Sequence, residues 1–119
     1  MMHPTKTAQE IGIVYALHSD ALISPYPAMV RLGSSVSRKS KEGVVIGANQ
    51  CIDAEDAIKA YTYGGAYTTF EENKKGLIKQ GMFADLTVLD KDPTKVNPDS
   101  IKNIKVNTTT VGGKIVYQR

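Results

Sequence analysis

Hydrophobic residues at the start of the chain form one continuous run, from Ile11 to Leu17. The run is rich in β-branched residues and does not alternate with polar ones, which is typical of a strand covered on both faces. Residues 5–10, just before it, have the composition of the end of a helix. The order of helix, short link and buried strand therefore predicts a βα unit with a parallel sheet.

Short helices are predicted in the middle of the chain. Pro25 and Pro27 suit a loop that leads into a weak helix over residues 29–36, with an irregular connection over residues 34–49. A firmer helix begins at Asp53, which can cap it. Its apolar face is formed by Ala54, Ala57, Ile58 and Tyr61. The pair Gly64–Gly65 costs about 1 kcal/mol per glycine relative to alanine, so we expect it to divide this region into two helices joined at a bend.

In the last third of the chain, apolar residues occur at every second position. Ala84, Leu86 and Val88 alternate with the residues between them, which predicts a strand with Ala84 and Leu86 on its buried side. Gly112–Gly113 separates two β-rich runs and predicts a tight hairpin turn. The last third is therefore expected to be antiparallel.

These patterns predict an α+β chain of three parts. We expect a βα remnant over residues 1–52, connecting helices over 53–75 and a β module over 76–119. The chain has 119 residues, of which 41% are hydrophobic, and this is enough for one ordinary core. A disordered chain is excluded by the same composition.

Charge does not indicate a polyanion partner, although the net charge is +3. The densest basic group, Arg38, Lys39 and Lys41, lies in a serine-rich stretch without aromatic residues. We interpret it as a solvated loop and expect no nucleic acid partner. No apolar run approaches the roughly 20 residues that cross a bilayer, so no membrane contact is expected. One cysteine, Cys51, and the lack of a signal-peptide pattern favour a cytoplasmic protein.

Asp20 is the main candidate for chemistry. A carboxylate that directly follows a buried parallel strand lies at the carboxyl end of a sheet, where α/β barrels carry their catalytic groups. There it could bind a divalent metal or move a proton. The alternative, which composition alone favours, is that Asp20 caps the next helix or turn.

Histidine residues do not complete a metal site. His18 lies on the same side of an extended strand as Asp20, so a mixed pair is conceivable, but a single histidine at a strand end is usually structural. His3 lies near the start of the chain. A mononuclear metal site needs three or four protein ligands, and these residues do not supply them.

Four segments resemble the amidohydrolase superfamily. Residues 14–21, which end in Ser-Asp-Ala, resemble its last barrel strand, and residues 52–72 resemble a helical segment with an Ala-Tyr-Thr core. The most specific match is residues 75–86, which resemble the family's Lys-Gly-Ser-Ile-x-x-Gly-Lys-x-Ala-Asp-Leu segment. Residues 111–117 resemble its closing hairpin. The Val-Ser-Arg run at residues 36–38 is similar to the family 3 branch.

This resemblance implies the C-terminal segment of a metal-dependent amidohydrolase. The implied fold is a remnant of a (β/α)8 barrel, with its last strand and helices, plus the C-terminal strands of a small β-sandwich. Asp20 would be a metal ligand and proton shuttle in the hydrolysis of a carbon–nitrogen bond of a small molecule. The metal is expected to be zinc in the complete enzyme, with none necessarily bound by this segment, because the other ligands would lie upstream of Met1. His18 and Gly64 depart from the family pattern, which usually has Gly and often Asn there.

A segment of this kind is expected to be inactive alone. Its exposed strand edges would drive binding to an upstream barrel half or self-association. The alternative is a non-catalytic scaffold or interaction domain derived from such an enzyme, with Asp20 acting only as a cap.

Overall fold

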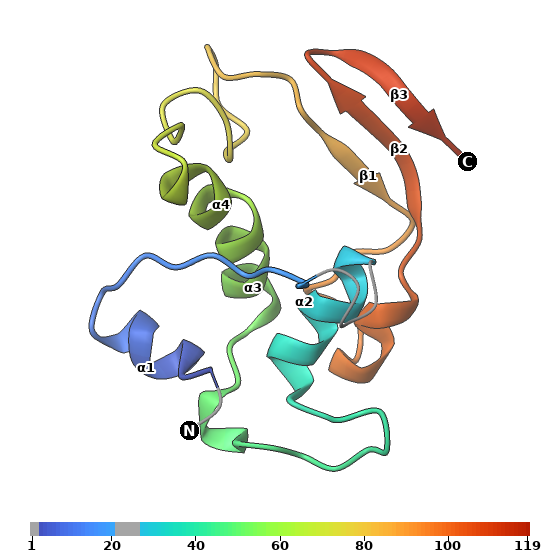
Figure 1. Cartoon of the computed structure of the whole chain (residues 1–119). Coiled ribbons are helices and arrows are strands. Elements are labelled where there is room, and N and C mark those ends of the chain that lie inside the picture. Colours follow the sequence, from blue (N-terminus) through green and yellow to red (C-terminus); the bar gives the residue numbers. More distant parts are fainter. Residues whose placement is uncertain (1–2, 21–26) are drawn as a thin grey trace.

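The computed structural model describes residues 3–20 and 27–119. Its elements are four α-helices, two short 3-10 helices and one three-stranded sheet within those residues (Figure 1). In chain order they are α1 (Thr5–Glu10), α2 (Ala28–Ser37), η1 (Ala48–Gln50), α3 (Ala54–Tyr61), α4 (Tyr63–Thr68), β1 (Thr87–Leu89), η2 (Pro98–Asn103), β2 (Val106–Val111) and β3 (Lys114–Gln118). An α+β chain is therefore confirmed. No helix in the described part of the chain is long and apolar enough to cross a membrane.

The first helix, α1, is held to η1 by side-chain hydrogen bonds. The Thr5 hydroxyl donates to the Gln50 carbonyl oxygen at 2.7 Å. The Gln50 side chain in turn accepts from the Thr7 backbone N–H and donates to the Thr7 hydroxyl. Because Thr5 and Gln50 are both buried, these bonds satisfy polar groups that burial would otherwise leave without partners.

The predicted strand over Ile11 to Leu17 is wrong. Residues 11 and 12 form a turn after α1 and residues 13–17 belong to no strand, and Ile11 and Ile13 are 67% and 54% exposed. The described residues contain no parallel strand beside it, so its backbone has no ladder to join and its apolar side chains have no second layer to enter. It crosses α3 and α4 as a single stretch of chain outside the sheet (Figure 1).

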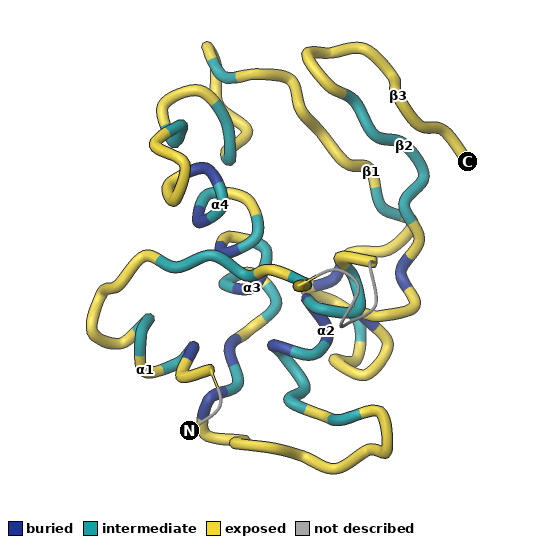
Figure 2. The backbone as a smooth tube through the Cα atoms, in the orientation of Figure 1, coloured by how far each residue is buried: buried dark blue, intermediate teal, exposed yellow. Residues whose placement is uncertain are grey.

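The core lies where α2, α3 and η2 meet. Its buried apolar residues come from three separate regions of the chain: Leu32, Ile52, Ala57, Ile101 and Ile104. Figure 2 shows dark buried segments on the helices, whereas β1 and β3 are mainly exposed and β2 is mainly of intermediate burial. Gly33 allows the close approach of α2 to η2, because a Cβ at that position would lie 3.2 Å from the Lys102 backbone nitrogen.

Two short helices joined at a bend are confirmed, but the bend is not at the glycines. Asp53 caps α3 as predicted, and its carboxylate accepts the Asp56 backbone N–H at 2.8 Å. The break falls at Thr62, where the backbone angles are φ −96° and ψ −76°, and Gly64 and Gly65 lie inside α4. Helix propensity placed the interruption two residues too late. Gly64 lies inside α4 instead, where the Tyr15 backbone approaches it closely.

The sheet is antiparallel, in the order β1-β2-β3. The hairpin between β2 and β3 turns at Gly112 and Gly113, whose φ angles of +55° and +78° suit a two-residue turn of the mirror-image type. The Asp85 carboxylate accepts the Gly112 backbone N–H at 2.7 Å and ties the chain before β1 to this turn. The predicted hairpin is confirmed.

The expected burial within this sheet is wrong. Ala84 and Leu86 are exposed rather than buried, although the Leu86 backbone exchanges both its hydrogen bonds with Thr110 of β2. Every residue of β3 is exposed. No residue of the three strands is fully buried within the described part of the chain, although Leu89 packs against the core, so alternation of apolar positions does not lead to a buried side here.

Candidate functional site

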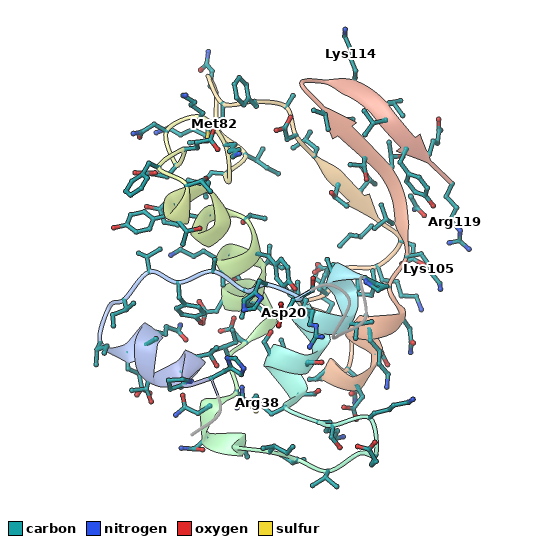
Figure 3. All side chains as sticks on the ribbon, viewed as in Figure 1. Asp20, Arg38, Met82, Lys105, Lys114 and Arg119 are labelled. Carbon is teal, nitrogen blue, oxygen red and sulfur yellow. The ribbon has the colours of Figure 1, made fainter. Side chains whose placement is uncertain are left out.

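Asp20 ends the extended segment that crosses α3 and α4. It is exposed, and its backbone has a left-handed φ of +47°, which is uncommon for a residue other than glycine. Figure 3 places it near the centre of the molecule, beside α2. Ala21 and Pro25, which the sequence analysis placed after it, lie outside the described residues.

Asp20 does not cap the helix that follows. The residue at the N-cap position of α2 is Pro27, and no side chain caps that helix. The capping role that composition favoured for Asp20 is therefore wrong with respect to α2. The Asp20 carboxylate lies on the surface instead, at the end of segment 11–20.

Arg31 of α2 holds the backbone next to Asp20. Its Nη2 atom donates to the Ser19 carbonyl oxygen at 3.4 Å, which is a long bond. Its Nε atom is buried and makes no hydrogen bond to any described residue. A buried guanidinium N–H without an acceptor is costly, so this atom is one place where a polar partner would stabilise the protein.

Tyr15 of segment 11–20 and Tyr61 of α3 both have a pKa above the ordinary value of a tyrosine. Burial raises the pKa of Tyr61, and the nearby positive charge of Arg31 offsets part of that rise. Burial also raises the pKa of Tyr15, and the negative charges of Asp56 and Asp53 raise it further. The Tyr61 hydroxyl is buried with no hydrogen-bond partner among the described residues. Two unsatisfied donors, on Arg31 and Tyr61, therefore lie close enough to interact electrostatically.

The residues present do not form a metal centre. No group of three or more His, Cys, Asp or Glu side chains lies together within residues 3–20 and 27–119. Residues 1–2 and 21–26 contain none of these four residue types in the sequence. His18 is exposed two residues before Asp20, and His3 lies near Arg38, which donates to the His3 carbonyl oxygen. The donor set of this chain does not satisfy a mononuclear site, which needs three or four ligands.

The glycine-rich segment over residues 75–86 has a structural role. Gly76 has a φ of +96°, and a Cβ there would lie 2.9 Å from the Ala66 Cβ and 3.0 Å from the Thr62 carbonyl oxygen. Gly81 is also left-handed, with a φ of +90°. Glycine at these positions allows the chain to turn closely past α4 before it enters the sheet.

Two features of this region were not predicted from the sequence. Arg31 was not recognised, because its contact with the Ser19 carbonyl depends on how the chain folds back between them. Gly64 was noted only as a departure from a family pattern. The structure shows its physical reason: a Cβ at position 64 would lie 2.1 Å from the Tyr15 carbonyl oxygen, so no side chain fits.

Comparison with known proteins gives the family. A sequence model of the amidohydrolase family matches residues 1–117 of the chain. The chain belongs to the amidohydrolase family. This confirms the resemblance found in the four sequence segments.

Two curated proteins share this part of the family's sequence. The chain is 35% identical over 117 residues to YtcJ of Bacillus subtilis (strain 168), a protein assigned as an amidohydrolase, covering 96% of this chain and 22% of YtcJ. It is 25% identical over 118 residues to an N-substituted formamide deformylase of Arthrobacter pascens, covering 99% of this chain and 22% of that enzyme. The chain thus spans about a fifth of the length of these relatives.

A solved structure supports the fold. The crystal structure of an amidohydrolase from Thermotoga maritima MSB8 is similar to this chain, with a TM-score of 0.69 and 23% sequence identity. The similarity covers 97% of this chain and 26% of that protein. The arrangement of α1 to β3 is therefore one that occurs within a larger amidohydrolase.

Proposed function

We propose that this chain is the C-terminal part of a metal-dependent amidohydrolase that hydrolyses a carbon–nitrogen bond of a small molecule. The match of the family model to residues 1–117 is the observation that carries this proposal. Further support comes from the place of Asp20, exposed at the end of a segment that resembles the last barrel strand of the family. We place the enzyme in the cytoplasm.

Asp20 is the catalytic residue in this proposal. As a metal ligand and general base it would accept a proton from the attacking water and later pass it to the leaving nitrogen. A divalent metal, zinc by the family resemblance, would supply the Lewis acidity for this class of reaction. The other ligands must come from outside these 119 residues, either from an upstream barrel half or from another chain.

The substrate class is proposed from one relative. The Arthrobacter protein is named for N-substituted formamides, and it is similar to this chain over 118 residues. A small amide of that kind is therefore a suitable first substrate for an assay. Most of a substrate pocket would be formed by the remaining length of such a protein, since this chain spans 22% of that relative.

The test has two stages. The 119-residue chain is purified with added zinc, and bound metal and hydrolysis of an N-substituted formamide are measured. We expect neither stoichiometric tight metal nor turnover. The chain is then produced together with the protein segment encoded upstream of Met1, and metal binding and hydrolysis are expected to appear. Tight metal with turnover in the 119-residue chain alone would contradict the proposal.

Asp20→Asn is the decisive variant in the assembled protein. We expect kcat/KM to fall by about 10² to 10⁴, as for loss of a general base. Asp92→Asn, which makes the same charge change at another exposed carboxylate, is the matched control and should leave activity unchanged. Unchanged activity in Asp20→Asn would instead favour a non-catalytic scaffold.

A further inference from the structure

A cleft of about 1130 Å³ lies between α1, residues 15–18, α2 and η2. It brings Lys102 together with four basic side chains of residues 31–41: Arg31, Arg38, Lys39 and Lys41. Asp99 is the one carboxylate among the described residues that line it, and Asp99 is ion-paired with Lys39. The cleft therefore carries an excess of positive charge, and part of it comes from Arg38, Lys39 and Lys41, which we had interpreted as a solvated loop.

Some of these cations already have partners. The Arg38 guanidinium donates to the carbonyl oxygens of Ile46 at 3.1 Å and His3 at 3.3 Å. Lys39 is engaged by Asp99. Arg31 differs from both, because its one hydrogen bond to a described residue is the long contact with Ser19, and its Nε atom has no acceptor. Arg31 is thus the arginine of the cleft with the most unused hydrogen-bonding capacity.

We propose that this cleft binds an anionic group of the substrate, a carboxylate or a phosphate, with Arg31 as its main partner and Lys102 as a second. This inference rests on the proposed function, because it gives the class of substrate: a small amide that carries a negative charge. The planar guanidinium of arginine can form two parallel hydrogen bonds with either group, and a partly enclosed site strengthens such bonds. Lys102 lines the same cleft and adds a second positive charge.

The position of the cleft fits an anion that is part of the substrate. Arg31 contacts the carbonyl of Ser19, the residue directly before Asp20, and His18 also lines the cleft. An anionic group held by Arg31 would therefore lie near the backbone that leads into Asp20, although the Asp20 side chain does not itself line the cleft. Asp20 is itself negative and would repel the anion. The positive charge of Arg31, which binds the anion, reduces this repulsion.

A long polyanion is a poorer match than a small anion. Figure 3 shows Lys105, Lys114 and Arg119 along the sheet, away from Arg38 at the other end of the molecule. The basic residues therefore do not form one continuous track of the kind that follows a nucleic acid backbone. The excess charge is concentrated in the cleft.

The test measures anion binding by the 119-residue chain. The ¹⁵N-labelled protein is titrated with sodium phosphate and, separately, with sodium acetate, at constant ionic strength, and amide chemical shifts are followed by NMR. We expect saturable shifts at residues 15–20 and 30–34. Saturation by phosphate alone would assign the substrate group as a phosphate, and saturation by acetate alone would assign it as a carboxylate.

Two variants and one matched control decide the role of Arg31. Arg31→Gln is expected to weaken binding by about tenfold, the effect of losing a charge-assisted hydrogen bond. Lys102→Gln should weaken it by a smaller factor, and it tests the same cleft if Arg31→Gln does not fold. Lys114→Gln makes the same charge change on the β2–β3 hairpin and should leave the affinity unchanged.

Two results would overturn the inference. One is the absence of saturable shifts with either anion. The other is equal weakening in Lys102→Gln and Lys114→Gln, which would show that only net charge matters. The titration involves no hydrolysis, so its failure is separate from failure of the proposed function, which the Asp20→Asn assay measures in the assembled protein.

Discussion

The backbone carbonyl of Tyr15 lies directly against Gly64 of α4. A Cβ built at position 64 would come within 2.1 Å of the Tyr15 oxygen and 3.0 Å of its carbonyl carbon. Both atoms belong to backbone, which cannot rotate away as a flexible side chain can. The missing side chain at Gly64 therefore sets how closely segment 11–20, which leads to Asp20, approaches the helices.

Gly64→Ala should destabilise the chain. The new methyl group must displace the Tyr15 backbone, and such overpacking costs about 1–3 kcal/mol. Urea unfolding followed by circular dichroism measures the change. Gly65→Ala is the matched control, because it lies in the same helix with no heavy atom within 4 Å of its notional Cβ. That control should raise stability by up to about 1 kcal/mol through helix propensity. Equal effects of the two substitutions would contradict the close contact.

Ile101 should be the most sensitive apolar residue of η2. It is 1% exposed and joins α2 to the core, so Ile101→Ala should lower the free energy of unfolding by about 2–5 kcal/mol. Ile115→Ala removes the same atoms from a residue that is 60% exposed, and it should change stability by less than about 0.5 kcal/mol. Both values come from chemical denaturation. A large loss in Ile115→Ala would show that something covers the sheet in solution.

The cap of α3 is expected to be worth about 1 kcal/mol. The Asp53 carboxylate accepts the Asp56 backbone N–H, so Asp53→Ala leaves a helix N-terminal donor unsatisfied and should reduce stability by that amount. Asp53→Asn keeps an acceptor oxygen at the same place and should retain most of the stability. Thermal unfolding of the three proteins provides the comparison. A loss in Asp53→Asn as large as in Asp53→Ala would show that charge, rather than the hydrogen bond, stabilises α3.

Stability should fall at high pH because of Tyr15 and Tyr61. Burial raises the pKa of both phenols above their ordinary value of 10.0, so the folded protein keeps their protons longer than the unfolded chain does. Their contribution is complete below pH 10 and is lost as the pH rises through the raised values. Unfolding free energies measured from pH 8 upward should show this decline.

Tyr61→Phe separates the contribution of that residue. It removes a buried hydroxyl that has no hydrogen-bond partner among the described residues, so stability at pH 7 should stay the same or rise by about 1 kcal/mol. The alkaline decline should become shallower in the same variant. A clear loss of stability at pH 7 would indicate that the hydroxyl has a partner in solution.

Caps and turns in the sequence correctly predicted the helices and hairpins that depend only on neighbouring residues. The cap at Asp53 and the paired glycines at 112 and 113 act within a few residues of chain, so α3 and the β2–β3 hairpin followed from the sequence. Segment Ile11 to Leu17 failed because its state depends on strands that would have to come from elsewhere. A run of apolar residues records what a segment needs for burial and does not show whether a partner is present.

The candidate site also has one part that local sequence predicts and another that depends on distant residues. Asp20 was found from its place after an apolar run and from family resemblance, both of which are properties of local sequence. The basic cleft could not be found in this way, because Lys102 reaches it from η2 and Arg31 from α2. Charges that look scattered in the sequence converge only when the chain folds.

The packing of α2 against η2 closes a long loop of the chain, and the length of that loop can be changed at small cost. Ile101 packs in the same core cluster as Leu32, nearly seventy residues earlier in the chain. Much of the chain between α4 and η2 is irregular and exposed. The entropy of closing such a loop rises only with the logarithm of its length, by about 0.6 kcal/mol for each doubling. Insertions in the exposed turn around Gln80 should therefore be tolerated, and this turn is a suitable place to attach a reporter peptide without disturbing the core.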